Sequence, residues 1–232
     1  MPALAIRTSI AAAILALLPL PGVAAAEGTR SGSPEQQRIE DAYTVRLQAA
    51  QEKAQDQRIA AQAKALLSDS ASPVLGNPKG DVTIVEFFDY TCPYCKAVEP
   101  RLQKLLKDDR NVKIVVKEFP ILTPESLIAA KVALASQKQG KYLQYHQALM
   151  NFKGRLANDV IFDTAKSVGL DVDRVRKDME APEITDEIIA NFNLARSLRI
   201  FQTPAFISGG HMLDSTSANI DFTRVAASVR GK

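Results

Sequence analysis

The sequence is poor in the residues that build disulfide scaffolds, metal sites and nucleic-acid surfaces. Its 232 residues include two cysteines and two histidines. Two cysteines exclude a disulfide-stapled scaffold and any four-cysteine zinc site. The formal net charge is only +3, and no run of Lys and Arg concentrates it, so we expect no nucleic-acid partner. Hydrophobic residues make up 46 % of the chain, which allows a buried core and excludes full disorder.

The first 26 residues predict an export signal. Arg7 is the only charge before Glu27, an apolar run covers residues 10–20, and small residues precede a cleavage site after Ala26. The apolar run of 11 residues is shorter than the about 20 that span a bilayer. We expect cleavage there, with an uncleaved anchor as the alternative. The mature protein would then be soluble in a compartment where disulfides persist.

Residues 27–70 predict an N-terminal helical arm. Residues 34–67 contain no glycine, and no proline after the first position, so we expect one helix over this range. Its apolar positions are sparse, and a heptad that starts at Ile39 places Arg46 and Lys53 on the seam, which argues against a strong coiled coil. The arm is either a solvated helix or a surface that associates with its copies as a dimer or trimer. A long helix with few core contacts favours association.

A strand, a helix and a second strand follow the arm. Residues 68–80 hold two prolines and two glycines, which predicts a linker and the start of a domain over 71–232. Residues 81–89 and 112–116 are nearly continuous apolar runs, as in strands covered on both faces. Helical periodicity lies between them. This order is typical of a βαβ unit with parallel strands.

The rest of the domain predicts mainly helices. From residue 124 to about 200 we expect four or five helices, with breaks at Gly140, Gly154, Gly169 and Pro182. A Gly-Gly turn between two short strands then predicts an antiparallel hairpin near residues 205–213. A last helix is expected near residues 218–229.

The two cysteines lie where the first strand gives way to a helix. Pro93 suits the first helical position, which places Cys92 at the cap. Its sulfur then faces the free amides of the first turn and the positive end of the helix dipole, so the pKa of Cys92 should fall below about 8.5. A low pKa keeps the attacking thiolate populated and makes it a good leaving group. Cys95, one turn inside the helix, is the natural resolving thiol.

Two other interpretations of this pair are half a zinc site and an inert pair. Half a zinc site would need further ligands, and neither His146 nor His211 has zinc-finger spacing. An inert pair would have no reason to sit at a proline-marked helix start after a strand. The βαβ context therefore favours redox chemistry.

The stretch EFFDYTCPYC from Glu86 to Cys95, the helical block and the Thr203-Pro204 pair before a hairpin resemble the DsbA-like disulfide oxidoreductases of the bacterial periplasm. The resemblance covers about residues 75–232. The arm and the turn at residues 76–81 are similar to the suppressor-of-copper-sensitivity protein C branch and to its Com1-like relatives. This resemblance implies a thioredoxin fold with an inserted helical domain, of the α/β class, and a periplasmic location.

Several functional residues follow from the resemblance. The family nucleophile corresponds to Cys92 and the resolving thiol to Cys95. The cis-proline loop of the family corresponds to Thr203 and Pro204, and in the family this loop binds the substrate backbone. Pro93 and Tyr94 are expected to contact the substrate as well. The threonine before that proline is similar to the residue at this place in isomerase-type members of the family. Tyr94 stands where the strong oxidase has histidine, which argues against extreme oxidising strength.

Charged residues of the family near the buried cysteine resemble Glu86, Glu99 and Lys117. A buried carboxyl at Glu86 could exchange a proton with Cys95, because burial raises its pKa. Glu99 is either a partner of Glu86 or a surface charge, and Lys117 either shares this site or caps a strand end. His146 is expected as surface or core filler, and His211 is not assigned to the site.

The predicted activity is thiol–disulfide exchange on unfolded or misoxidised exported proteins through a Cys92 mixed disulfide, with no cofactor and no metal. We expect a disulfide isomerase or reductase that works with a membrane redox partner. The alternatives are a monomeric dithiol oxidase and a chaperone-like module whose thiolates bind copper(I), a soft ion.

Overall fold

The computed structural model describes residues 33–214 and 220–231, so the predicted export signal lies outside the described residues. The chain divides into two units, residues 1–46 and 47–232. The first contains Ser33 and the first part of helix α1 (Pro34–Ala61). Ser33 and Gln36 each accept a hydrogen bond from the other's backbone N–H, which caps the helix at its start. All described residues of this unit are exposed.

The prediction of one helix over residues 34–67 is wrong at a single position. α1 ends at Ala61, and a short helix α2 (Ala63–Leu67) follows Gln62. No glycine or proline signals this break. It lies where the chain buries Ile59 and Leu66, which are 4 % and 1 % exposed, in the core of the second unit. Packing of these two side chains overrides the local helix preference.

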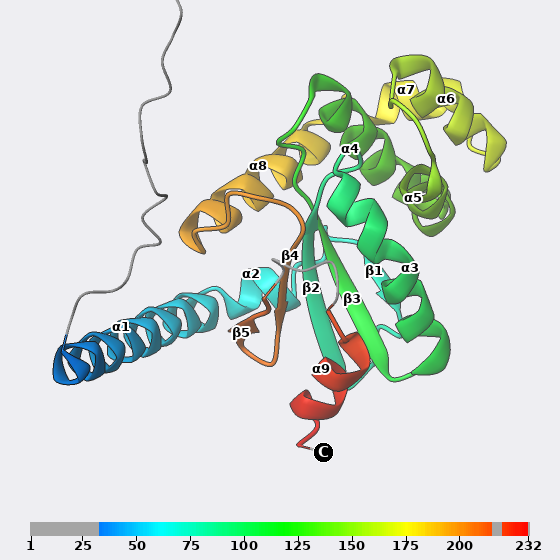
Figure 1. The fold of residues 1–232 in the computed structure, drawn as a ribbon. Helices are drawn as coiled ribbons and strands as arrows, with labels where there is room; N and C mark the ends of the chain where they lie inside the picture. The colour runs from blue at the N-terminus through cyan, green and yellow to red at the C-terminus, as the bar shows by residue number, and fades with distance from the viewer. Residues whose placement is uncertain (1–32, 215–219, 232) are drawn as a thin grey trace, which may run out of the picture. The chain divides into compact units, whose positions relative to one another are not determined.

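The second unit is built on a mixed five-stranded sheet in the order β1-β3-β2-β4-β5 (Figure 1). β2 (Val82–Phe88) and β3 (Val112–Glu118) are parallel and joined by α3 (Pro93–Asp108), which confirms the predicted βαβ unit. β4 (Ala205–Ser208) and β5 (His211–Met212) form the predicted hairpin. Gly209 and Gly210 turn it with φ of 60° and 86°, which other residues rarely adopt.

The first edge of this sheet lies within the predicted linker. β1 (Val74–Gly76) pairs antiparallel with β3 and buries Leu75. Three residues among prolines and glycines are too few to show a strand period, so the sequence pattern could not separate this strand from a loop. The pairing with β3 supplies the hydrogen bonds that make it one.

Two cores cover the two faces of the sheet. Side chains alternate along a strand, so Ile84 and Phe88 of β2 face α3, whereas Val85 and Phe87 face α2 and the end of α8 (Pro182–Ser197). α9 (Phe222–Val229) packs on the α3 face. The last helix was expected from about residue 218 and begins at Phe222. Residues 218 and 219 lie outside the described residues.

The inserted helical domain lies between β3 and β4, as the predicted fold class requires (Figure 1). Pro182 begins its last helix, α8, as predicted. The other elements that precede α8 are α4 (Pro124–Ser136), the 3-10 turn η1 (Gln137–Gln139), α5 (Tyr142–Asn151), α6 (Asn158–Ser167) and α7 (Val172–Asp178).

In the part of the chain that the structure describes, no helix is long and apolar enough to cross a membrane.

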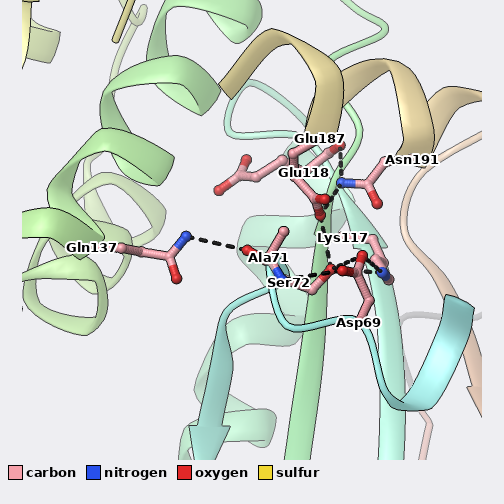
Figure 2. Close-up of polar contacts among 8 residues, drawn as sticks. All are labelled: Asp69, Ala71, Ser72, Lys117, Glu118, Gln137, Glu187 and Asn191. Carbon is pink, nitrogen blue, oxygen red and sulfur yellow. Dashed lines mark hydrogen bonds and ion pairs between the residues drawn. The ribbon is translucent and has the colours of Figure 1, made fainter. Parts of the chain in front are cut away.

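A buried polar cluster ties the chain after α2 to the sheet (Figure 2). Lys117 of β3 is fully buried, and its Nζ lies 2.9 Å from Asp69 Oδ2 and 2.6 Å from Ser72 Oγ. Ser72 in turn donates to Glu187 Oε1 on α8 at 2.8 Å, and Asn191 Nδ2 donates to the same oxygen at 3.2 Å. The cluster therefore joins the segment after α2, the strand β3 and the helix α8.

This placement corrects the expectation that Lys117 lies near the buried cysteine or caps a strand end. Lys117 pairs in register with Phe87, whose side chain lies in the core on the side away from α3. The two-residue period of the strand sends Lys117 to that face, whereas both cysteines lie in the core on the α3 face. The sequence spacing alone could not assign the face, because β3 is buried on both sides.

We predict that Lys117→Met lowers the free energy of unfolding by about 3 kcal/mol, because it leaves the carboxylate of Asp69 without its buried cation. Denaturant unfolding of the reduced protein measures this. The matched control is Lys113→Met on the same strand, which is half-buried and should change stability by about 0.5 kcal/mol or less. The exchange rate of folded Lys117→Met should equal that of the parent. A large loss of rate in the folded variant would contradict the assignment of Lys117 to the opposite face.

Candidate active site

Cys92 caps the first turn of α3, as predicted. It follows β2 by a short turn, has extended backbone angles (φ −71°, ψ 117°) and precedes Pro93 at the first helical position. The Cys95 N–H donates to Cys92 Sγ at 3.4 Å. The sulfur thus occupies the place of a capping oxygen, where the unpaired N–H groups of the helix favour negative charge.

The Thr203-Pro204 loop lies against this sulfur. The peptide bond between Thr203 and Pro204 is cis. Cys92 Sγ lies 3.3 Å from the Thr203 carbonyl oxygen, across 111 positions of sequence. The sheet explains this meeting, because β4 begins directly after Pro204 and pairs with the end of β2, with Ala205 opposite Phe87.

The two thiols have very different acidities. A hydrogen bond from the Cys95 thiol lowers the pKa of Cys92 to about 6; burial opposes this shift, and Thr203 and the N–H groups of Cys95 and Tyr94 add to it. Burial raises the pKa of Cys95, and the neighbouring Cys92 and Glu86 raise it further. Both cysteines are free thiols in this structure. Near neutral pH the pair therefore holds one thiolate and one thiol.

The residues between the cysteines face solvent. Pro93 is exposed, and Tyr94 is 66 % exposed. Phe201, close to the cis-proline loop in sequence, is 73 % exposed and was not singled out from the sequence. A lone aromatic residue before the loop gives no periodic signal, so only the structure reveals its exposure.

Glu86 lies on β2 with its side chain on the α3 face. It is fully buried, and neither carboxyl oxygen has a hydrogen-bond partner among the described residues. Burial raises the pKa of Glu86 well above its usual range, with Glu99, Cys92 and Glu118 adding to the shift. The sequence predicted both the burial and the raised pKa. A carboxyl with a raised pKa on the cysteine side of the sheet can donate its proton and, once ionised, can take one up.

Glu99 is also buried, at 2 % exposure, so the surface alternative for it is wrong. Burial pushes its pKa up, but the nearby His146 and a hydrogen bond from Gln103 lower the pKa below its usual value. His146 Nε2 lies 3.7 Å from Glu99 Oε2. His146 is a core residue, one of the two places that the sequence allowed for it.

A polar network behind the cysteines was missed by sequence reasoning. Glu118 Oε1 accepts hydrogen bonds from Tyr142 Oη at 2.8 Å and from Tyr90 Oη at 3.0 Å. Tyr90 Oη also lies 3.1 Å from His146 Nδ1. Burial raises the pKa of Glu118 well above its usual range, although both tyrosines lower it. No sequence signal indicated this network, because β3 is buried on both sides and the tyrosine partners come from the loop after β2 and from α5.

Asp89 fixes the loop that carries Cys92. Its Oδ1 accepts from the Thr91 N–H and from Ser126 Oγ, each at 2.7 Å. Its Oδ2 accepts from the N–H groups of Ile121 and Leu122, each at 3.0 Å. One buried carboxylate therefore ties the active-site loop to the entry into the helical domain.

His211 lies on the hairpin, away from the cysteine pair. His211 is exposed and pairs through Nδ1 with Asp56 Oδ2 at 2.9 Å, on the hairpin. Over residues 33–214 and 220–231, no group of three or more His, Cys, Asp or Glu side chains is arranged to hold a metal ion.

Comparisons with known proteins agree with this geometry. The model of the DSBA-like thioredoxin domain family matches residues 83–224. A Rickettsia typhi protein named as a protein-disulfide oxidoreductase is 29 % identical over 168 residues, which cover 66 % of this chain and 62 % of the relative. The matched part spans about three fifths of the length of such curated relatives.

Solved structures give the same result. A thioredoxin-like oxidoreductase from Silicibacter pomeroyi is 40 % identical, with a TM-score of 0.70 over 73 % of this chain and 98 % of that one. The catalytic domain of Proteus mirabilis ScsC is 30 % identical, with a TM-score of 0.67 over 76 % of this chain and 97 % of that one. The fold is a thioredoxin fold with inserted helices, and it carries a cysteine pair at the start of the helix after β2. The chain belongs to the DSBA-like thioredoxin domain family.

We predict that alkylation of Cys92 in the reduced protein rises with pH around a midpoint of about 6. This pKa lies below the pKa of about 8.5 that a cysteine has in the unfolded chain. The thiolate therefore stabilises the folded reduced form fully above about pH 8.5, and this stabilisation is lost as the pH falls through about 6. Iodoacetamide labelling followed by mass spectrometry measures the profile.

Cys95→Ala should shift this midpoint upward, because it removes the thiol hydrogen bond that lowers the pKa of Cys92 most. Cys95→Ser keeps a hydroxyl donor and should shift the midpoint less. A parent midpoint near that of an ordinary cysteine would contradict the assigned acidity of Cys92.

Proposed function

We propose that this protein is a periplasmic thiol–disulfide oxidoreductase that acts on unfolded or misoxidised exported proteins as a disulfide isomerase or reductase. The observation that carries the proposal is the asymmetric pair: a capping Cys92 with a pKa of about 6, against the cis-proline loop, backed by a buried Cys95 thiol. Membership of the DSBA-like family supports the reaction class.

The reaction begins when the Cys92 thiolate attacks one sulfur of a substrate disulfide. The substrate S–S bond breaks, a Cys92–substrate disulfide forms, and the second substrate sulfur leaves as a thiolate. In isomerisation, another substrate thiolate attacks the substrate sulfur of this intermediate and releases Cys92 unchanged. In reduction, the Cys95 sulfur attacks Cys92, so the substrate leaves reduced and the Cys92–Cys95 disulfide forms.

The remaining site residues then take distinct roles. Thr203 and Pro204 would pair with the substrate backbone beside Cys92, and the exposed Pro93 and Tyr94 would contact its side chains. Cys95 must lose its proton before it attacks, and its burial disfavours the thiolate. Glu86 lies on the same side of the sheet without a hydrogen-bond partner among the described residues, so we assign the acceptance of this proton to its ionised form. A membrane redox partner would return the oxidised pair to the dithiol form.

Substitution of each catalytic cysteine by alanine tests the reaction class. Cys92→Ala should lose thiol–disulfide exchange with a peptide disulfide. Cys95→Ala should retain the first attack and accumulate a Cys92–substrate disulfide, because the resolving thiol is gone. Non-reducing gel electrophoresis and mass spectrometry after mixing with a disulfide-containing protein detect the adduct. Full exchange activity in Cys92→Ala, or stoichiometric copper(I) binding without any exchange, would contradict the proposed function.

The isomerase role rests on association through the arm, residues 34–67. Ile39, Tyr43 and Leu47 follow one another at four-residue intervals on α1, which places them on one face. They are 63 %, 63 % and 43 % exposed. A stripe of this kind gains stability by burial against a copy of itself. Association would present several Cys92 sites to one misoxidised substrate.

We predict that Ile39→Asp with Tyr43→Asp converts an oligomer into a monomer and abolishes reactivation of a scrambled multi-disulfide protein. Light scattering and recovery of substrate activity are the measurements. The control Gln37→Asp with Gln48→Asp adds the same charge to the opposite side of the helix and should change neither. Both variants should keep the parent rate on a small peptide disulfide. A monomeric parent that rapidly oxidises reduced substrates would instead favour the dithiol oxidase.

A further inference from the structure

A groove runs beside the nucleophile, between the start of α3 and the segment after α5. Its volume is about 560 Å³, and its lining includes Thr91 and Pro93, the two sequence neighbours of Cys92. Met150, Phe152 and Leu156 supply apolar surface on the side of the helical domain. A substrate segment whose cysteine reacts with Cys92 would therefore place a nearby side chain in this groove.

The rim of the groove is basic. Lys153 and Arg155 line it, both are exposed, and neither has a hydrogen-bond or ion-pair partner among the described residues. Glu125 is the one acidic residue in the lining. Lys131 and Lys138 of the helical domain, by contrast, are paired with carboxylates. The rim thus holds two cations that are free to meet an anionic ligand.

Hydrogen bonds from α3 hold the wall of the groove that follows α5 in place. Lys96, on the first turns of α3, donates through Nζ to the carbonyl oxygens of Leu149 at 2.7 Å and Phe152 at 2.9 Å. These bonds attach the end of α5 to α3. Gly154 then turns the chain with φ of 129°, a conformation open to glycine, between the two basic residues. The rim charges therefore stand on a segment that is fixed relative to Cys92.

We propose that this groove is a substrate-recognition site that selects cysteine segments with an acidic residue close to the reactive cysteine. The inference rests on the proposed function and names its substrate class. An apolar floor accepts the stem of the flanking side chain, and Lys153 and Arg155 attract its carboxylate. Charge complementarity of this kind acts mainly on the rate of encounter and on the choice of partner.

Three peptides that differ only in the residues flanking one cysteine, Asp, Asn or Lys, test the proposal. Each carries that cysteine as a thiopyridyl disulfide. The Cys92 thiolate of the pre-reduced protein attacks the peptide sulfur, the S–S bond to thiopyridine breaks, and the released thiopyridine takes a proton from solvent and absorbs in the ultraviolet. The initial rate gives the second-order rate constant for each peptide.

The expected order is Asp, then Asn, then Lys, with about a tenfold span at low salt, as two exposed charge pairs allow. The span should shrink at high ionic strength, because the charges are exposed. Lys153→Glu with Arg155→Glu should reverse the order and leave the rate on the Asn peptide within about twofold of the parent.

The matched control is Lys166→Glu with Lys177→Glu. These exposed lysines lie on α6 and α7, outside the groove lining, and their replacement changes the net charge equally. The control should keep the parent order. Equal rates for all three peptides in the parent, or a reversal in the control as large as in the rim variant, would overturn the selection of acidic segments. Failure on the Asn peptide as well would instead contradict the proposed function itself.

Discussion

The free N–H groups at the start of α3 face the sulfur of Cys92, and this contact is the constraint around which the site is arranged. It requires the sulfur to cap the helix and Cys95 to lie one turn inside, buried in the core. The same helix start leaves Pro93 and Tyr94 in solvent. One geometric feature thus produces an acidic nucleophile, a shielded second thiol and an exposed approach. The cis-proline loop completes the arrangement because β4 pairs with β2 beside it.

The neighbours Lys117 and Glu118 show how the sheet divides buried charge between its faces. Lys117 lies on the side away from the cysteines and binds Asp69 and Ser72, whereas Glu118 lies on the α3 face and accepts from two tyrosines. Burying either polar side chain without partners would be costly. The partners come from the segment after α2, from α5 and from the loop after β2. These two residues therefore help to determine where three separate segments pack.

The helical domain does more than cover the sheet. Asp89 attaches the loop before Cys92 to the entry of α4, and Lys96 attaches α3 to the end of α5. Both contacts start within a few residues of the cysteine pair. The domain is consequently held in a defined position beside the nucleophile, and its surface can select substrates without any part in the exchange of sulfur atoms.

Local chemistry was enough to predict the βαβ unit, the capping position of Cys92 and the burial of Glu86, because strand periods, a proline at a helix start and apolar runs are properties of short segments. It also located the helix breaks at Gly140, Gly154, Gly169 and Pro182, since glycine and proline act on the backbone directly. Contacts between distant segments decided the rest: the break at Gln62, the edge strand β1, the face taken by Lys117 and the tyrosine partners of Glu118. No short stretch of sequence contains both members of these contacts, so only the tertiary structure could bring them together.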